Sequence, residues 1–366
     1  MLAALEIPFT LEAFFKAIEQ DDVRAVRLFH AAGVDLSNTK TPVDTDEAPA
    51  IYVAADAGSR KVFRYLPENG VDVNTPSGWN GQTALLRAIS RRDFEMVYAL
   101  LNAGALAMGH LGRIHEHDPQ LLFWTTPLQY ALLDPDPVLV EALLNKGASV
   151  KERYASNVTP LMRAAKDTSD DVVKVLLSKG ASVKEVDNNG MTALHYVFMD
   201  TSKKAKLDVI RVLIEAGADV NHAAKGGLTP ILMATMPGDE DGMRFLLAHG
   251  ADPNKVYRVE REEELPFVLL GQNNTALIDA MIGGVTPLML ASAYGHKTIA
   301  EILLQNGADP HAVAKRQNGA HTAMILTLAG GHHELANRMR AYGAPVRGAI
   351  PTFLQELANR IRAYLK

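Results

Sequence analysis

Histidine and carboxylate side chains stand together at two places in the sequence, and both kinds of side chain bind zinc and similar ions. The first place is residues 115–118, which read His-Glu-His-Asp. Adjacent side chains rarely converge on one ion unless a helix or strand directs them, and the chain has no Cys to complete a common structural set. At the second place, His332-His333-Glu334, no second His follows four residues later. We therefore predict no metal site and no cofactor, and interpret residues 115–118 as a solvated loop or a partner contact.

Three catalytic patterns are absent from the sequence: the phosphate-binding Gly-x-x-x-x-Gly-Lys loop, the Gly-x-Ser-x-Gly nucleophile turn and the His-Glu-x-x-His helix. The absence of Cys also excludes disulfides and cysteine nucleophiles. We predict that the chain is not an enzyme and assign no catalytic residue. A site assembled from histidines and carboxylates of inserted segments is the alternative that the sequence leaves open.

Binding to another macromolecule is the second chemistry to weigh, and Trp, Tyr and Arg are its typical anchoring side chains. Trp79 precedes Asn80-Gly81, a strong turn signal, and Trp124 also falls just before a helix start. In the structural alternative, each indole covers the neighbouring turn. Residues 91–93, Arg-Arg-Asp, are interpreted as solvated residues on an outer helix face. The candidate partner-binding residues are Trp79, Asn80, Arg113, His117, Trp124, Tyr257, Arg258 and Arg261.

Most of these candidates lie in two long irregular segments, residues 108–125 and 255–283. A shorter segment with three Lys residues, 200–207, extends a connection between two helices. Long irregular loops on a regular scaffold often carry function. We therefore predict that the two long segments add binding specificity to whatever scaffold holds them.

The signal for the scaffold is a glycine that ends an apolar helical run and recurs at intervals of 33 to 57 residues. Helices often end in a left-handed residue, a conformation that glycine adopts without strain. Intervals close to 33, lengthened by insertions, are the mark of a repeat array. The recurring glycines are Gly33, Gly70, Gly104, Gly147, Gly180, Gly217, Gly250, Gly307 and Gly343.

A threonine marks the start of most of these units. Thr caps a helix by accepting from free backbone N–H groups, and Pro is tolerated in the first turn because its missing N–H would be unpaired there. Gly or Asn two positions upstream suits a tight turn. Each unit therefore reads turn, helix, helix, turn. The threonines are Thr83, Thr126, Thr159, Thr192, Thr229, Thr286 and Thr322.

Residues 286–310 and 190–221 combine both signals, and there the sequence resembles ankyrin repeats. The resemblance covers most of the chain. It implies an all-α solenoid of helix-turn-helix units with short β-hairpin-like turns, irregular insertions and terminal caps. It also implies a protein partner on a concave surface formed by turn tips and first helices.

The whole chain, 1–366, is predicted to form this single solenoid. Residues 1–37 lack the Thr-Pro-Leu start and are interpreted as an N-terminal capping repeat, because a terminal repeat has no neighbour on one side. Residues 38–347 hold the ankyrin repeats. Residues 348–366 place Phe353, Leu357, Ile361 and Leu365 on one helical face and are interpreted as a closing helix, with a partner-binding helix as the alternative.

Composition narrows the choice of partner. The net charge of −5 and pI of 6.2 argue against binding a nucleic-acid backbone. No stretch reaches the roughly 20 apolar residues of a membrane helix, and the N-terminus matches a secretory signal poorly. We therefore expect a soluble, cytoplasmic and monomeric protein without nucleic-acid or membrane partners.

Three functions follow from these observations. The favoured one is a scaffold or regulator that holds a protein partner in the repeat surface, with the insertions adding specificity. The second is a secreted bacterial effector that engages host proteins, as many ankyrin-repeat proteins do. The third is an enzyme with a site built from the insertions.

Overall fold

The computed structural model describes residues 9–41, 47–77, 81–108, 126–167, 170–199, 207–259, 281–316 and 319–344. Contacts divide the chain into two units. The first unit comprises Met1–Ala155 with Ser178–Ala181, and the second comprises Ser156–Leu177 with Ser182–Lys366. The regular structure of the described residues is helical apart from one two-stranded sheet, which confirms the predicted fold class.

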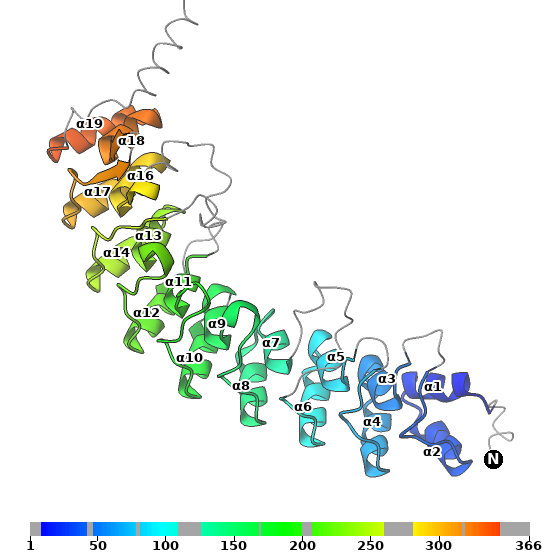
Figure 1. Cartoon of the computed structure of the whole chain (residues 1–366). Helices are drawn as coiled ribbons and strands as arrows, with labels where there is room; N and C mark the ends of the chain where they lie inside the picture. The colour runs from blue at the N-terminus through cyan, green and yellow to red at the C-terminus, as the bar shows by residue number, and fades with distance from the viewer. Residues whose placement is uncertain are drawn as a thin grey trace, which may run out of the picture. The chain divides into compact units, whose positions relative to one another are not determined.

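The part of the first unit that the structure describes contains four helix pairs, drawn from blue to green in Figure 1. The first helices of successive pairs lie side by side, since α1 packs on α3, α3 on α5 and α5 on α7. Among the second helices, α2 packs on α4 and α6 on α8. The pairs are α1 (Leu11–Glu19) with α2 (Val23–Ala31), α3 (Ala50–Ala57) with α4 (Arg60–Glu68), α5 (Ala84–Ser90) with α6 (Phe94–Asn102), and α7 (Pro127–Ala131) with α8 (Pro137–Asn145).

Within its described residues, the second unit contains five pairs built in the same way. Its first helices α9, α11, α13, α16 and α18 each pack on the next, as do its second helices α12, α14 and α17 (Figure 1). The pairs are α9 (Pro160–Asp167) with α10 (Asp170–Ser178), α11 (Ala193–Tyr196) with α12 (Leu207–Glu215), α13 (Pro230–Thr235) with α14 (Glu240–Ala248), α16 (Pro287–Tyr294) with α17 (Lys297–Gln305), and α18 (Ala323–Ala329) with α19 (His333–Ala341).

Short irregular elements complete the repeats. The 3-10 turns η3 (Ala155–Asn157) and η4 (Lys225–Gly227) each precede a first helix. Strands β1 (Val313–Arg316) and β2 (Gly319–Thr322) pair antiparallel, with Val313 opposite Thr322. This hairpin is of the kind that the sequence predicted between repeats.

Threonine starts the first helices as predicted. Thr126 Oγ1 accepts from the N–H of Gln129 at 3.0 Å, and Thr286 Oγ1 accepts from Met289 at 3.3 Å. Thr229 differs, because its buried hydroxyl has no partner in the described part of the chain. The repeat-ending glycines have φ between +81° and +101°, which confirms the left-handed ends inferred from the sequence.

The core consists of aliphatic side chains between successive helices. In α10 Val172, Val173 and Leu176 are fully buried, and in α17 Ile299 and Leu303 are at most 1% exposed. The first pair instead uses aromatic rings, with the rings of Phe14 and Phe29 edge to face at 5.6 Å. The predicted closing helix, residues 348–366, lies outside the described residues.

Candidate partner-binding surface

Two of the eight candidate residues lie in the described part of the chain, namely Tyr257 and Arg258. The main chain at this point is fixed on both sides. Tyr257 exchanges two backbone hydrogen bonds with Val285, at 2.9 and 2.8 Å, and the N–H of Arg258 donates to the carbonyl of Gly226 at 2.7 Å. The start of segment 255–283 is therefore fastened to its end and to the preceding turn. The other candidates, Trp79, Asn80, Arg113, His117, Trp124 and Arg261, lie outside the described residues.

The two described side chains have different surroundings. The ring of Tyr257 is 3% exposed, so it packs inside the array and offers little surface to a partner. Arg258 is exposed, and its Nη2 donates to the carbonyl of Gly283 at 3.3 Å. Of these two residues, only Arg258 presents its side chain at the surface.

A glycine pair at the turn before Thr229 makes this fastening possible. A Cβ at Gly226 would stand 2.5 Å from the carbonyl oxygen of Arg258, and one at Gly227 would stand 2.6 Å from that of Val256. Any side chain would push the two strands of main chain apart. The Gly-Gly sequence before Leu-Thr-Pro is the signal that pointed to this close approach.

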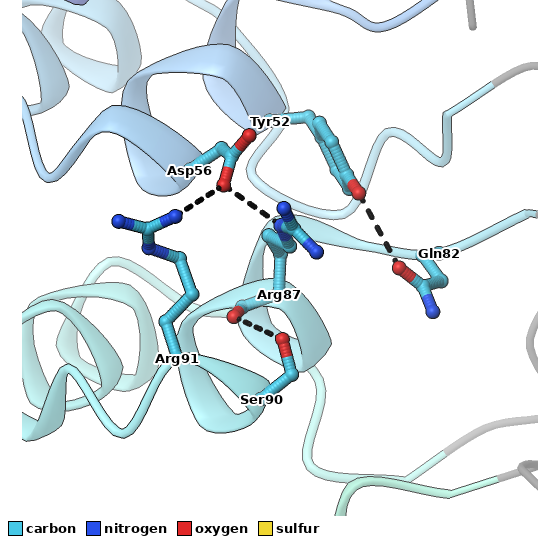
Figure 2. Close-up of polar contacts among 6 residues, drawn as sticks. All are labelled: Tyr52, Asp56, Gln82, Arg87, Ser90 and Arg91. Carbon is cyan, nitrogen blue, oxygen red and sulfur yellow. Dashed lines mark hydrogen bonds and ion pairs between the residues drawn. The ribbon is translucent and has the colours of Figure 1, made fainter.

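A second group of polar side chains, partly or fully exposed, lies on and beside the first helices of the first unit. It was not among the sequence-based candidates, and we call it the arginine cluster. Figure 2 shows its members reaching toward one another from α3, from α5 and from the turn before α5. The arginine cluster consists of Tyr52, Asp56, Gln82, Arg87, Ser90 and Arg91.

Asp56 is the centre of the arginine cluster. One of its oxygens, Oδ1, accepts from Arg87 Nε at 2.8 Å and from Arg91 Nη1 at 3.1 Å (Figure 2). The three side chains are 37%, 35% and 50% exposed, so the group faces solvent. Beside them, the hydroxyl of Tyr52 donates to Gln82 Oε1 at 3.3 Å. One carboxylate oxygen thus ties two arginines of the next repeat to α3.

The electrostatics of Arg87 reflect this arrangement. The hydrogen bond that it donates to Asp56 raises the pKa of its guanidinium, against the opposing effect of burial. The charge of Asp56 and the phenols of Tyr52 and Tyr130 act in the same upward direction. Arg87 therefore carries a permanent positive charge with a tyrosine on the helix to either side.

Arg91 and Arg92 are exposed to solvent as predicted, but the structure corrects the placement of residues 91–93 on an outer helix face. Helix α5 ends at Ser90 and Arg91 is its C-cap, so the Arg91 side chain leaves from the last turn of a first helix. Arg87 and Arg91 stand four residues apart and share one helix face. Arg92 forms an ion pair with Asp134, which follows α7. Asp93 caps α6 and pairs with Arg60 at 2.8 Å.

The second unit holds a buried polar group with a structural role. His195 is fully buried, and burial lowers the pKa of its imidazole to about 4, so the ring is neutral. Its Nε2 lies 3.1 Å from the carbonyl of Leu228. Nearby, Tyr196 donates to Asp187 at 3.0 Å, and burial raises the pKa of that phenol. These side chains are buried, and their hydrogen bonds hold neighbouring turns together.

Among residues that the structure describes, no three His, Asp or Glu side chains are arranged to hold a metal ion. His332 instead turns its Nε2 toward the carbonyl of Ala293 at 3.4 Å. Residues 115–118 lie outside the described part. Within that described part, no helix combines the length and apolar character needed to cross a membrane.

Curated proteins with similar sequences match short stretches of the chain. A putative ankyrin repeat protein of Rickettsia bellii (strain RML369-C) is 37% identical over 67 residues, 18% of this chain and 28% of that protein. A putative ankyrin repeat-containing protein of Treponema pallidum (strain Nichols) is 36% identical over 86 residues, 24% of this chain and 27% of that protein. An L-asparaginase of Dirofilaria immitis is 32% identical over 90 residues, 25% of this chain and 14% of that protein. The chain thus covers less than a third of each relative.

The crystal structure of the human ASB11 ankyrin repeat domain superposes on 66% of this chain and 98% of its own, with a TM-score of 0.50 and 24% identity, a likeness of fold. Residues 14–107, 108–187 and 180–257 each match the family model for ankyrin repeats in three copies, and residues 283–315 match the model for a single ankyrin repeat. Repeats of this kind are protein–protein interaction modules, and the fold is typical of non-enzymatic binding scaffolds. The chain belongs to the ankyrin-repeat family.

Proposed function

We propose that this protein is an interaction scaffold or regulator that binds a macromolecular partner through the exposed faces of its first helices and through its inserted segments. The observation that carries the proposal is the arginine cluster. Arg and Tyr are enriched among the residues that dominate binding energy at interfaces. Here they stand half-exposed on consecutive first helices, on the side where the ankyrin family generally binds proteins.

The inserted segments supply the second part of the surface. Both ends of segment 255–283 are held by the pairing of Tyr257 with Val285, so the segment starts and ends at a fixed base. Arg258 stands exposed at that base. We include Trp79, Asn80, Arg113, His117, Trp124 and Arg261 in the proposed surface on the strength of their residue types and their places in turns and insertions.

The proposal is tested by placing a photo-crosslinking amino acid at one position at a time in the full chain. Ser90 reports on the first-helix face, and Arg64, exposed on the second helix α4, is the matched control. In extracts of the native organism, we expect a discrete crosslinked protein from position 90 and none from position 64. Equal crosslinking from both positions, or none from either, would contradict the proposal.

A trimmed chain separates the two parts of the surface. Short turns replace residues 109–125 and 260–280, which leaves the anchoring pair Tyr257 and Val285 in place. Loss of the crosslink at Ser90 from the trimmed and still folded chain would assign specificity to the insertions. Retention of the crosslink would assign it to the first helices.

The remaining choices form part of the same proposal. We place the protein in the cytoplasm as a monomer without nucleic-acid partners, and the secreted effector of host proteins is the alternative biological role. An enzyme built from the insertions is the third hypothesis. Identification of the crosslinked partner separates the first two, because a host protein would indicate an effector.

A further inference from the structure

We propose that the arginine cluster binds the carboxylate side chain of an Asp or Glu in an extended segment of the partner protein. The inference rests on the proposed function and names the chemistry that the first-helix face recognises. Its basis is the unused hydrogen-bonding capacity of two arginines that a single aspartate holds in place.

The donors of the two guanidinium groups are only partly used. A guanidinium carries several N–H groups in a planar fork that matches the two oxygens of a carboxylate. Arg87 uses Nε and Arg91 uses Nη1, and both bind the same atom, Oδ1 of Asp56. Among the described residues, neither guanidinium has a second acceptor. Both terminal amino groups of Arg87 therefore stay available for a second carboxylate.

The charge of the surrounding face favours such a ligand. Helix α5 contains no acidic residue, and it contributes Arg87 to this face, with Arg91 at its C-cap. Against these two arginines stands Asp56, the one acidic residue of α3, α5 and α7. The face is thus locally positive on a chain whose net charge is −5, so an acidic segment is attracted here and repelled by the chain as a whole.

Asp56 acts as a positioning residue in this arrangement. Two exposed arginines four positions apart on one helix repel each other and sample many rotamers. A shared acceptor at 2.8 and 3.1 Å holds both in one geometry before the ligand arrives. A partner carboxylate therefore meets a prearranged site, which reduces the entropy cost of binding.

Side chains on and after α7, the first helix of the next repeat, predict which residue the partner carries near its carboxylate. Leu133, two residues after the end of α7, is 37% exposed, and the half-buried Tyr130 lies one turn before it. Packed helices lie about 8–10 Å apart and an extended segment rises about 3.3 Å per residue, so crossing from α5 to α7 takes about three residues. We therefore expect an apolar side chain about three positions from the acidic one.

A random peptide library displayed on phage, selected on the full chain, tests the inference. We expect the recovered peptides to share an Asp or Glu with an apolar residue about three positions away. For one such peptide, Arg87→Gln in the protein and Glu→Gln in the peptide should each weaken binding about tenfold. The two changes should not add, because each removes the same contact. Arg91→Gln leaves Arg87 paired with Asp56 and serves as the second variant, and Arg64→Gln is the control.

Three results would decide against the inference. If the peptide change weakens binding equally with and without Arg87→Gln, the carboxylate binds elsewhere. The variant Ser90→Trp places a large side chain on the first-helix face and so blocks it. If the recovered peptides lack acidic residues but fail to bind this variant, the face binds a ligand other than a carboxylate, and the proposed function survives. If Ser90→Trp binds every recovered peptide unchanged, the first-helix face is not the binding surface, and the proposed function loses its main support as well.

Discussion

His195 shows how one side chain can connect two turns of this fold. Its Nδ1 lies 3.2 Å from the backbone N–H of Thr192, which can only donate, so Nδ1 is the acceptor. In the neutral ring the proton therefore sits on Nε2 and is donated to the carbonyl of Leu228 at 3.1 Å. The imidazole thus joins the start of α11 to the residue before Thr229, and it does so only while uncharged.

This requirement predicts acid sensitivity of the second unit. Burial lowers the pKa of His195 from 6.5 to about 4, so between these values the unfolded chain binds more protons than the folded one. The stabilisation is complete above pH 6.5 and is lost as the pH falls toward 4. The free energy of unfolding should fall by about 1.4 kcal/mol per pH unit across that window.

The measurement is denaturant unfolding at a series of pH values, compared with His195→Gln. Gln at this position can still accept from the cap residue Thr192 but does not titrate. We expect the variant to be less stable at neutral pH and to lose much of the slope. An unchanged slope would assign the acid sensitivity to other groups.

Two glycines share the left-handed backbone conformation but differ in how closely other atoms surround them, so replacing each by Ala separates backbone strain from steric crowding. Gly295 has φ +75°, and a Cβ there would overlap the ring of His332, which is also hemmed in by Gly330. Gly307 has φ +85° with no atom within 4 Å. Gly307→Ala should therefore cost only the left-handed strain of about 1–2 kcal/mol. Gly295→Ala should cost more, because His332 must also give up its contact with Ala293. Thermal unfolding checks the difference, and equal midpoints would refute it.

At the scale of elements, successive repeats are joined by an asparagine four residues after a repeat-ending glycine. Asn221 Nδ2 donates to the carbonyl of Gly250 and its Oδ1 accepts from the N–H of Asp252, both at 2.8 Å. Asn254 does the same with Gly307 and Asp309, at 2.9 and 2.7 Å. Each amide thus satisfies one free carbonyl and one free N–H at the start of the next turn.

Removing this bridge should loosen the junction between two repeats. Asn221→Ala leaves two backbone groups without their partner, at a cost of about 1–2 kcal/mol. Asn306→Ala is the control, because its amide donates to Ile302 within its own helix at 2.7 Å. We expect chemical denaturation to show the larger loss for Asn221→Ala. The bridge would be unimportant if the two variants unfolded alike.

Much of this architecture could be read from the sequence, because its signals are local. Thr286 and Gly307 fix where a helix pair begins and ends through their own backbone geometry. The asparagine bridges could not be derived in this way, since Asn221 and Gly250 meet only after two helices have packed. The family-level fold was therefore predictable, while the contacts that join its repeats were not.

The same reason explains what was missed in the candidate surface. Asp56 and Arg87 are 31 positions apart and approach only because α3 and α5 are neighbours. From the sequence, Arg91 was placed on an outer helix face, because no glycine or other C-cap signal in residues 90–92 marks the end of α5. Residue type alone pointed to the insertions, and it could not tell that Tyr257 is buried while the adjacent Arg258 is exposed.

At the scale of the whole molecule, the repeat architecture limits how far along the chain a substitution changes stability. In an array of this kind each repeat contacts only its neighbours, so stability is close to a sum of repeat and junction energies. The described helices follow this rule within each unit: α14 packs on α12 and α17. Under the proposed function, binding specificity comes from exposed side chains such as those of the arginine cluster, because the aliphatic core recurs from repeat to repeat after the first pair.

Hydrogen exchange of the Asn221→Ala variant tests this locality. Local opening governs exchange, and a weakened junction lowers the free energy of opening for the repeats that it joins. Amides of α12 and α14, which flank the bridge, should exchange faster by about tenfold, in line with a loss of about 1.4 kcal/mol. Amides of α3 to α6, in the first unit, should exchange at the rates of the unaltered chain. A uniform increase across both units would mean that the protein unfolds as one cooperative body, because only global opening spreads a local loss over every helix.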